Sequence, residues 1–291
     1  MNAGIAALVL LSAVLHASWN AIAKGIRDRL ASATLIGLAY LVIGAAGALW
    51  LPAPAAASWP FLACSACLQT AYLILLTAAY RHGDFGQVYP LARGLAVLLV
   101  AAVATVFLGQ YLTALQLAGV AVVAGSLLAL VLARPQTATP ASSDAARTGT
   151  AKGAGLAVLT GLCIAAYSLV DGVGVRHSGT PLGYAAWLFA VQGVTIPSAC
   201  YLLAPRKAPF LLQVRSHWRL GSLGGAVSLL AYSMVLWAQN QAPLALVSAL
   251  RETSVLLAGV IGAIFFAERF SPLRMVLTIA AVGGIVALQL G

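Results

Sequence analysis

The 291-residue chain is 62% hydrophobic and only 8% charged, whereas soluble proteins carry about 25% charged residues. This composition excludes an ordinary soluble domain, and apolar runs of about 20 residues without period-two alternation exclude a transmembrane β-barrel. The net charge of +10 comes from basic residues scattered between the apolar runs, so it indicates membrane topology rather than nucleic-acid binding. We predict an all-α integral membrane protein without a nucleic-acid partner.

Ten transmembrane helices are predicted along the chain, most of them near the ~20 residues needed to cross ~30 Å of hydrocarbon. We expect the first to be retained, because no cleavable signal precedes it. The ninth begins at Pro243 and the tenth at Pro272, where a missing N–H suits a first helical turn. The predicted spans cover residues 3–23, 31–51, 60–80, 86–108, 112–133, 153–173, 181–204, 217–239, 243–266 and 272–290.

One polar segment, residues 134–152, separates the first five spans from the last five. Its Pro, Ser, Thr and Ala content predicts a mobile connector. We therefore expect residues 1–133 and 153–291 to form two five-helix domains. Because each has an odd number of spans, the second enters the membrane in the opposite orientation, which predicts the inverted repeat common in secondary transporters.

The two halves also share a sequence pattern at an offset of 158 residues. This offset aligns Arg93 with Arg251 and Gly125 with Gly283, and it aligns residues 108–114 with 266–272. More weakly, Trp19-Asn20 in the first span resembles Tyr167-Ser168 in the sixth.

The basic residues predict the orientation of the protein. Of the 16 Lys and Arg residues, 13 follow an odd-numbered span, whereas Arg176 follows an even-numbered one and Arg93 and Arg251 lie within spans. The positive-inside rule then places the odd-to-even connections in the cytoplasm and both termini in the periplasm. The 13 residues are Lys24, Arg27, Arg29, Arg81, Arg134, Arg147, Lys152, Arg206, Lys207, Arg215, Arg219, Arg269 and Arg274.

The two arginines within spans are the strongest indication of function. An arginine at membrane depth costs several kcal/mol unless it faces a wet cavity or a partner. We expect Arg93, Arg251 or both to bind a carboxylate or phosphate of a solute, which suits the planar guanidinium. The alternatives are a structural ion pair or snorkelling to the surface. Glu252 could bind a substrate ammonium, carry a coupling proton, or hold Arg93 across the interface between spans four and nine.

Two spans carry polar side chains on one helical face, because these residues are three or four positions apart. They are His16, Trp19 and Asn20 in the first span, and Gln69 and Tyr72 in the third. Such faces usually point inward in a membrane bundle, although His16 could equally be a hydrogen-bonded structural residue and the aromatic residues could be interface anchors or packing. The weaker candidates are Tyr89, Trp187, Gln192, Tyr232 and Trp237. The predicted substrate-binding set is His16, Trp19, Asn20, Gln69, Tyr72, Tyr89, Arg93, Tyr167, Ser168, Tyr232, Trp237, Arg251 and Glu252.

No enzyme or cofactor signature is present. Metalloprotease, hydrolase and P-loop motifs are missing from the sequence, and Asp84 and Asp171 lie near span ends, so they do not suggest an intramembrane aspartyl pair. Gln110 and Glu268 are expected to organise the turns to the following spans. The four cysteines lie in apolar runs and are expected to be buried small residues. We expect no catalytic residue, metal or cofactor.

Several motifs resemble the ten-span EamA type of the drug/metabolite transporter superfamily. They are HASWNAIAKG (16–25), VYPLARG (88–94), LGQYLTALQLAGVAVVAGSLL (108–128) and FAERFSPLRMVLTIAAVGGIV (266–286). Gln110 stands where the family usually has an acidic residue. The resemblance implies ten helices around a central cavity, with spans one, three, four, six, eight and nine lining it.

The resemblance also implies a secondary transporter of the bacterial inner membrane that exports amino acids or related metabolites by alternating access. Residues 83–86 and 241–243 would act as gates or hinges. Its partners would be a small-molecule substrate and the lipid bilayer, and we expect a monomer. The alternatives are efflux of drugs or organic cations, transport of phosphorylated or phosphonate solutes, and a non-transporting lipid-binding protein.

Overall fold

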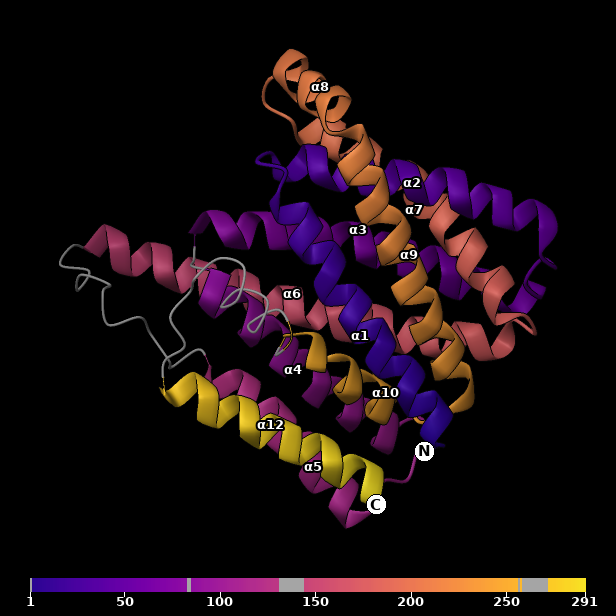
Figure 1. Ribbon diagram of the computed structural model, residues 1–291, viewed down its shortest axis with the longest axis vertical. Coiled ribbons are helices and arrows are strands. Elements are labelled where there is room, and N and C mark those ends of the chain that lie inside the picture. Colours follow the sequence, from indigo (N-terminus) through magenta and orange to yellow (C-terminus); the bar gives the residue numbers. More distant parts are fainter. Residues whose placement is uncertain (1, 83–84, 131–143, 256, 258–271) are drawn as a thin grey trace.

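The computed structural model describes residues 2–82, 85–130, 144–255, 257 and 272–291. All regular secondary structure within these ranges is helical (Figure 1). The helices are α1 (Ala3–Lys24), α2 (Arg29–Trp50), the short 3-10 helix η1 (Ala56–Ser58), α3 (Trp59–His82), α4 (Phe85–Val106), α5 (Ala114–Ala129), α6 (Asp144–His177), α7 (Pro181–Leu203), α8 (Lys207–Ser216), α9 (Trp218–Gln241), α10 (Leu244–Arg251) and α12 (Pro272–Leu290).

Seven helices of the described ranges are long and apolar enough to cross a membrane, namely α1–α4, α6, α7 and α9. The multi-pass, all-α class is therefore confirmed. Shorter apolar helices cover residues 114–129 and 275–290, where the fifth and tenth spans were predicted. Most of the predicted ninth span after residue 255, together with Glu268, lies outside the described residues, as do positions 83–84 of the predicted hinge. The ten-span count stays a prediction.

Two connections differ from the sequence expectation. The turn between the seventh and eighth predicted spans contains the helix α8, and α6 begins at Asp144, inside the segment expected to be a mobile linker. The second difference has a simple physical reason. Residues 144–152 include Ala, Arg and Lys, which favour helix, and extending an existing helix requires no core of its own because only nucleation is costly.

The helices pack in a pattern that relates the two halves. α2 packs along α7, α5 along α12, α1 along α9 and α3 along α6. The helices α1–α5 of the first half can be matched in order with α6, α7, α9, α10 and α12 of the second. Under this matching, the contact between α1 and α9 corresponds to the contact between α6 and α3. The contact of α4 with α6 likewise corresponds to that of α10 with α1. Each major contact therefore has a counterpart or maps onto itself, as a twofold relation between the halves requires.

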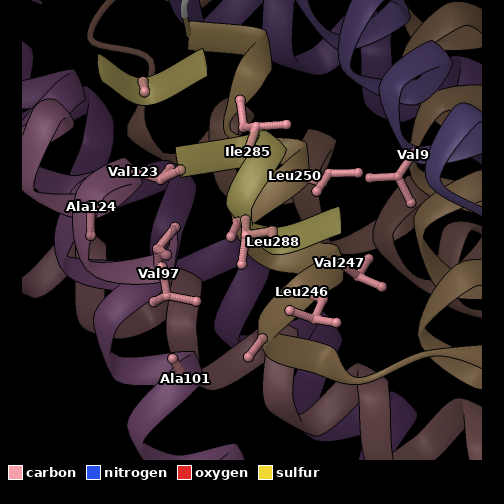
Figure 2. Packing of buried hydrophobic residues seen from close by; sticks show 14 of the residues in the cluster. Val9, Val97, Ala101, Val123, Ala124, Leu246, Val247, Leu250, Ile285 and Leu288 are labelled. Carbon is pink, nitrogen blue, oxygen red and sulfur yellow. The ribbon is translucent and has the colours of Figure 1, made fainter. Parts of the chain in front are cut away.

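The largest apolar cluster lies where α1, α4, α5, α9, α10 and α12 meet (Figure 2). Val97 of α4 is one turn beyond Arg93, and Leu250 directly precedes Arg251; both apolar side chains are fully buried. The helices that carry the two arginines are thus held in place by neighbouring residues that are buried in the apolar core. Figure 2 shows Val9 and Leu250 pointing toward one another within this cluster.

Close contact between α2 and α7 depends on glycine, because small residues let membrane helices approach. A Cβ atom added to Gly193 would lie 2.4 Å from the Cα of Leu41, and one added to Gly44 would lie 2.6 Å from the backbone N of Ala190. Neither position has room for a side chain.

We expect Gly193→Ala to destabilise the protein by about 1–3 kcal/mol, because the added methyl overpacks the α2–α7 contact. Gly125→Ala is the matched control, since a Cβ there meets nothing within 4 Å. Thermal unfolding in detergent measures the difference. Equal stability of the two variants would contradict the close α2–α7 packing.

Candidate substrate-binding site

An ion pair joins the two halves of the chain inside the bundle. Nη1 of Arg93, on α4, lies 3.0 Å from Oε1 of Glu252, which follows α10 directly. The two side chains are only 3% and 1% exposed. Of the three roles considered for Glu252, the structure shows the contact with Arg93. Removing one member of a buried pair leaves an uncompensated charge, which typically costs ~3–5 kcal/mol.

His16 of α1 contacts the same arginine. Its Nε2 lies 2.9 Å from Nη2 of Arg93, and its Nδ1 lies 3.2 Å from Nε1 of Trp19. Both neighbours can only donate, whereas a neutral imidazole accepts at one nitrogen and donates at the other. His16 can therefore accept a hydrogen bond from Arg93 or from Trp19, but not from both at once. Asn20 donates instead to the backbone carbonyl of His16, at 2.8 Å.

Arg251 is less well paired than Arg93. Arg251 is 4% exposed. Its Nε lies 3.9 Å from Oε1 of Glu252, and its guanidinium carbon lies 5.8 Å from the ring centre of Tyr232. Nε of Arg251 and Oε2 of Glu252 are both buried without a hydrogen-bond partner among the described residues. A buried donor and a buried acceptor, both unsatisfied, thus belong to adjacent residues. Arg93 also lies over an aromatic ring, 5.4 Å from the centre of Tyr89.

Asp171 is a second buried acid, although its position near the end of a predicted span did not suggest one. It lies on α6 with no exposed surface. Its carboxylate accepts hydrogen bonds from the hydroxyl of Tyr232 at 2.5 Å, the hydroxyl of Tyr184 at 2.9 Å and Nε2 of Gln69 at 3.2 Å. Side chains of α3, α7 and α9 therefore converge on one carboxylate of α6.

The spacing of Asp171 could have revealed this placement. It follows Tyr167 by four residues and Ser168 by three, so all three share one face of α6. The predicted span ended at residue 173, whereas α6 continues to His177. Asp171 consequently lies more than one turn inside the helix.

Tyrosine rings connect the two buried acids. Tyr167 contacts Tyr72 with ring centres 5.8 Å apart and Tyr232 with ring centres 6.3 Å apart. Tyr232 thus has the guanidinium of Arg251 over its ring and the carboxylate of Asp171 at its hydroxyl. The structure brings most of the predicted set into one network, namely His16, Trp19, Gln69, Tyr72, Tyr89, Arg93, Tyr167, Tyr232, Arg251 and Glu252.

Other candidates have more local surroundings. The backbone carbonyl of Ser168 accepts a hydrogen bond from Gln239, while its hydroxyl is buried without a partner among the described residues. Trp187 packs edge-on against Trp59, and Trp237 is half-buried. Gln192 is buried, and its Nε2 has no partner in the described part of the chain.

Gln110 has a different partner from the one expected. Its side-chain oxygen accepts a hydrogen bond from the backbone N of Leu244, at 2.8 Å, and so caps α10 of the other half. The turn into α5 is organised instead by Thr113 and Gln116, which form a reciprocal capping box. Within the residues that the structure describes, no group of three His, Cys, Asp or Glu side chains is suited to hold a metal. That the protein uses no metal or cofactor stays a prediction.

Comparison with known protein families finds a similarity in the second half of the chain. Residues 151–289 match the EamA-like transporter family. The second half of the chain is thus similar to an EamA-like transporter domain. The members of this family are transporters rather than enzymes. The similarity therefore indicates transport of small solutes across a membrane.

The fold extends beyond this domain. A solved structure described only as "Crystal structure of protein" superposes on 99% of this chain and 98% of its own, with a TM-score of 0.72 at 18% identity. This likeness shows that the whole chain shares one known fold. No curated protein matches the sequence.

The ion pair makes a direct prediction about stability. We expect Glu252→Gln to lower the free energy of unfolding by about 3–5 kcal/mol, because it leaves Arg93 buried and charged without a counter-ion. The double variant Arg93→Met with Glu252→Gln should recover much of this loss. Denaturant unfolding in detergent measures both variants, and equal losses in the single and double variants would contradict a direct pair.

Proposed function

We propose that the protein is a secondary transporter that exports amino acids or related small metabolites across the bacterial inner membrane by alternating access. Two inverted five-helix repeats would enclose the site. The reciprocal helix contacts support this arrangement, as do the EamA-like domain at 151–289 and the odd number of predicted spans in each half.

One observation carries the proposal for the substrate. Nε of Arg251 and Oε2 of Glu252 are buried without partners among the described residues, and unsatisfied buried polar groups in native proteins call for an explanation such as a missing ligand. Together they complement a zwitterion, with the guanidinium binding a carboxylate and the carboxylate oxygen binding an ammonium. Tyr232 would contact the apolar part of the solute.

The pairing of Arg93 weighs against phosphorylated solutes. A dianionic phosphate would favour two free guanidinium groups, but Arg93 is neutralised by Glu252 at 3.0 Å. Organic cations are disfavoured because Arg251 and Arg93 would repel them. A guanidinium whose Nε lacks a hydrogen-bond partner among the described residues, next to the carboxylate of Glu252, suits an amino acid better than either class.

The proposed orientation places both termini in the periplasm and α8 at the cytoplasmic surface. Exposed arginines flank α8, and the exposed Leu211 and Leu212 would face lipid, as in a helix at the membrane interface. In a cysteine-free background, we expect a membrane-impermeant maleimide added to intact cells to label Asn2→Cys but not Arg215→Cys. The opposite labelling would invert the topology.

Uptake of a panel of labelled amino acids into liposomes tests the substrate class. We expect Arg251→Gln to lower uptake about tenfold to a hundredfold with folding intact, because a charge-assisted hydrogen bond is worth ~1.5–3 kcal/mol. Arg219→Gln, which removes an exposed arginine packed on Trp218, is the matched control.

Two other outcomes would contradict this proposal. Transport of choline or a sugar phosphate, unaffected by Arg251→Gln, would leave Arg251 a structural residue. Binding of lipid headgroups without movement of any solute would favour the lipid-binding alternative.

A further inference from the structure

The proposed substrate contacts leave the buried acid Asp171 without a role. Its carboxylate has no exposed surface, and its three hydrogen-bond donors, from Tyr184, Tyr232 and Gln69, are all neutral. No ion pair to Asp171 occurs among the described residues. An ionised carboxylate inside a membrane is costly unless a cation or a proton compensates it.

The groups that face Asp171 define what can compensate it. α3 contributes Ser65 and Gln69, α7 contributes Tyr184 and α9 contributes Tyr232, all of them uncharged. α4 meets α6 through the apolar Ala92 and Ala96.

Two arginines, Arg176 and Arg251, come from elements that meet near Asp171, and their surroundings differ. Arg176, five residues along α6, is engaged with the carbonyl groups of Gln239 and Ala242. Arg251 reaches Asp171 through Tyr232, whose ring centre lies 5.8 Å from the guanidinium carbon and whose hydroxyl donates to the carboxylate of Asp171.

We propose that Asp171 binds a proton during the transport cycle and that this proton is linked to the occupancy of Arg251. The linkage rests on the proposed function, whereas the proton site does not. A proton from water binds Oδ2 of Asp171 and later returns to water. The hydroxyl of Tyr232 lies 2.5 Å from Asp171. It can donate to the ionised carboxylate, and a protonated carboxyl can donate to the phenolic oxygen instead.

The sign of the linkage follows from charge balance. Arg93 and Glu252 compensate one another, which leaves Arg251 and Asp171 as the other pair of opposite charges. When Asp171 takes up a proton, Arg251 loses its counter-charge and attracts a substrate carboxylate more strongly. Reciprocally, a carboxylate at Arg251 favours the protonated form of Asp171. Proton and solute are then carried in the same complex, so an inward proton gradient opposes export, and the outward gradient of the solute has to drive it.

Infrared difference spectroscopy of the purified full chain tests the proton site without any substrate. We expect the carbonyl band of a protonated carboxyl to appear as the pH is lowered in the wild type and in Asp28→Asn, but not in Asp171→Asn. Asp28 is the matched control because it caps α2 through the N–H groups of Leu30 and Ala31, and asparagine caps equally well. If no band depends on Asp171 between mildly acidic and mildly alkaline pH, the proposal is overturned.

The same band tests the linkage without a substrate. Arg251→Gln removes the counter-charge, so the Asp171 band should persist to higher pH than in the wild type. An unchanged titration would overturn the linkage. Tyr232→Phe, which keeps both charges but removes the bridging hydroxyl, should change the band position while Asp171 still titrates.

Binding of L-phenylalanine, as the probe solute, separates this proposal from the proposed function. We expect the wild type to bind it about tenfold more tightly at acidic than at alkaline pH, and Asp171→Asn to bind it independently of pH. The same pH dependence in Asp171→Asn would overturn the linkage. A different result would overturn only the proposed substrate class. In that case the wild type would neither bind nor transport any amino acid of the panel, while its Asp171 band would still titrate and respond to Arg251→Gln. The proton site would then stand.

Discussion

The contact between Arg93 and Glu252 is the constraint on which much of the interior depends. Both groups are buried in an apolar bundle, where neither charge is tolerable alone. One comes from each half of the chain, so folding of the two halves must bring α4 and the end of α10 into register. The apolar cluster contains Val97, one turn beyond Arg93, and Leu250, two residues before Glu252, and the low exposure of the two charged side chains strengthens their attraction.

The two copies of the sequence pattern use the same position for different purposes. At the offset of 158 residues, Glu252 aligns with Gly94. In the first half, a Cβ on Gly94 would lie 3.1 Å from the carbonyl oxygen of Ala124, so glycine there permits close packing of α4 on α5. In the second half, the same position carries the acid that neutralises Arg93. The repeat therefore supplies two arginines but one adjacent acid, and this asymmetry leaves Arg251 the less compensated of the two.

Hydropathy predicts the membrane helices because burial in lipid selects long apolar runs, and seven of the predicted spans meet that description in the structure. Boundaries are harder to predict, and they matter for function. Ending the sixth span at residue 173 made Asp171 look like a terminal residue, whereas four more helical residues place it in the interior. Contacts between distant segments follow no local rule at all. The hydrogen bond from Leu244 to Gln110 spans 134 residues, and no periodicity in either segment indicates it. The sequence shows that the buried charges of Arg93 and Glu252 need partners, but it does not show which partners they meet. Their pairing was therefore one of several possible roles for Glu252.

The buried pair also restricts how a transporter of this architecture can move. A cycle that separated Arg93 from Glu252 without offering either group water or a new partner would add ~3–5 kcal/mol to its barrier. Rocking of the halves with the α4–α10 contact kept closed avoids that cost. Arg93 retains some freedom within such a motion, because His16 can accept from either Arg93 or Trp19. A shift of α1 that exchanges one donor for the other leaves Arg93 bound to Glu252. The ion pair can thus remain intact while α1 shifts beside it, as the proposed rocking of the two halves would require.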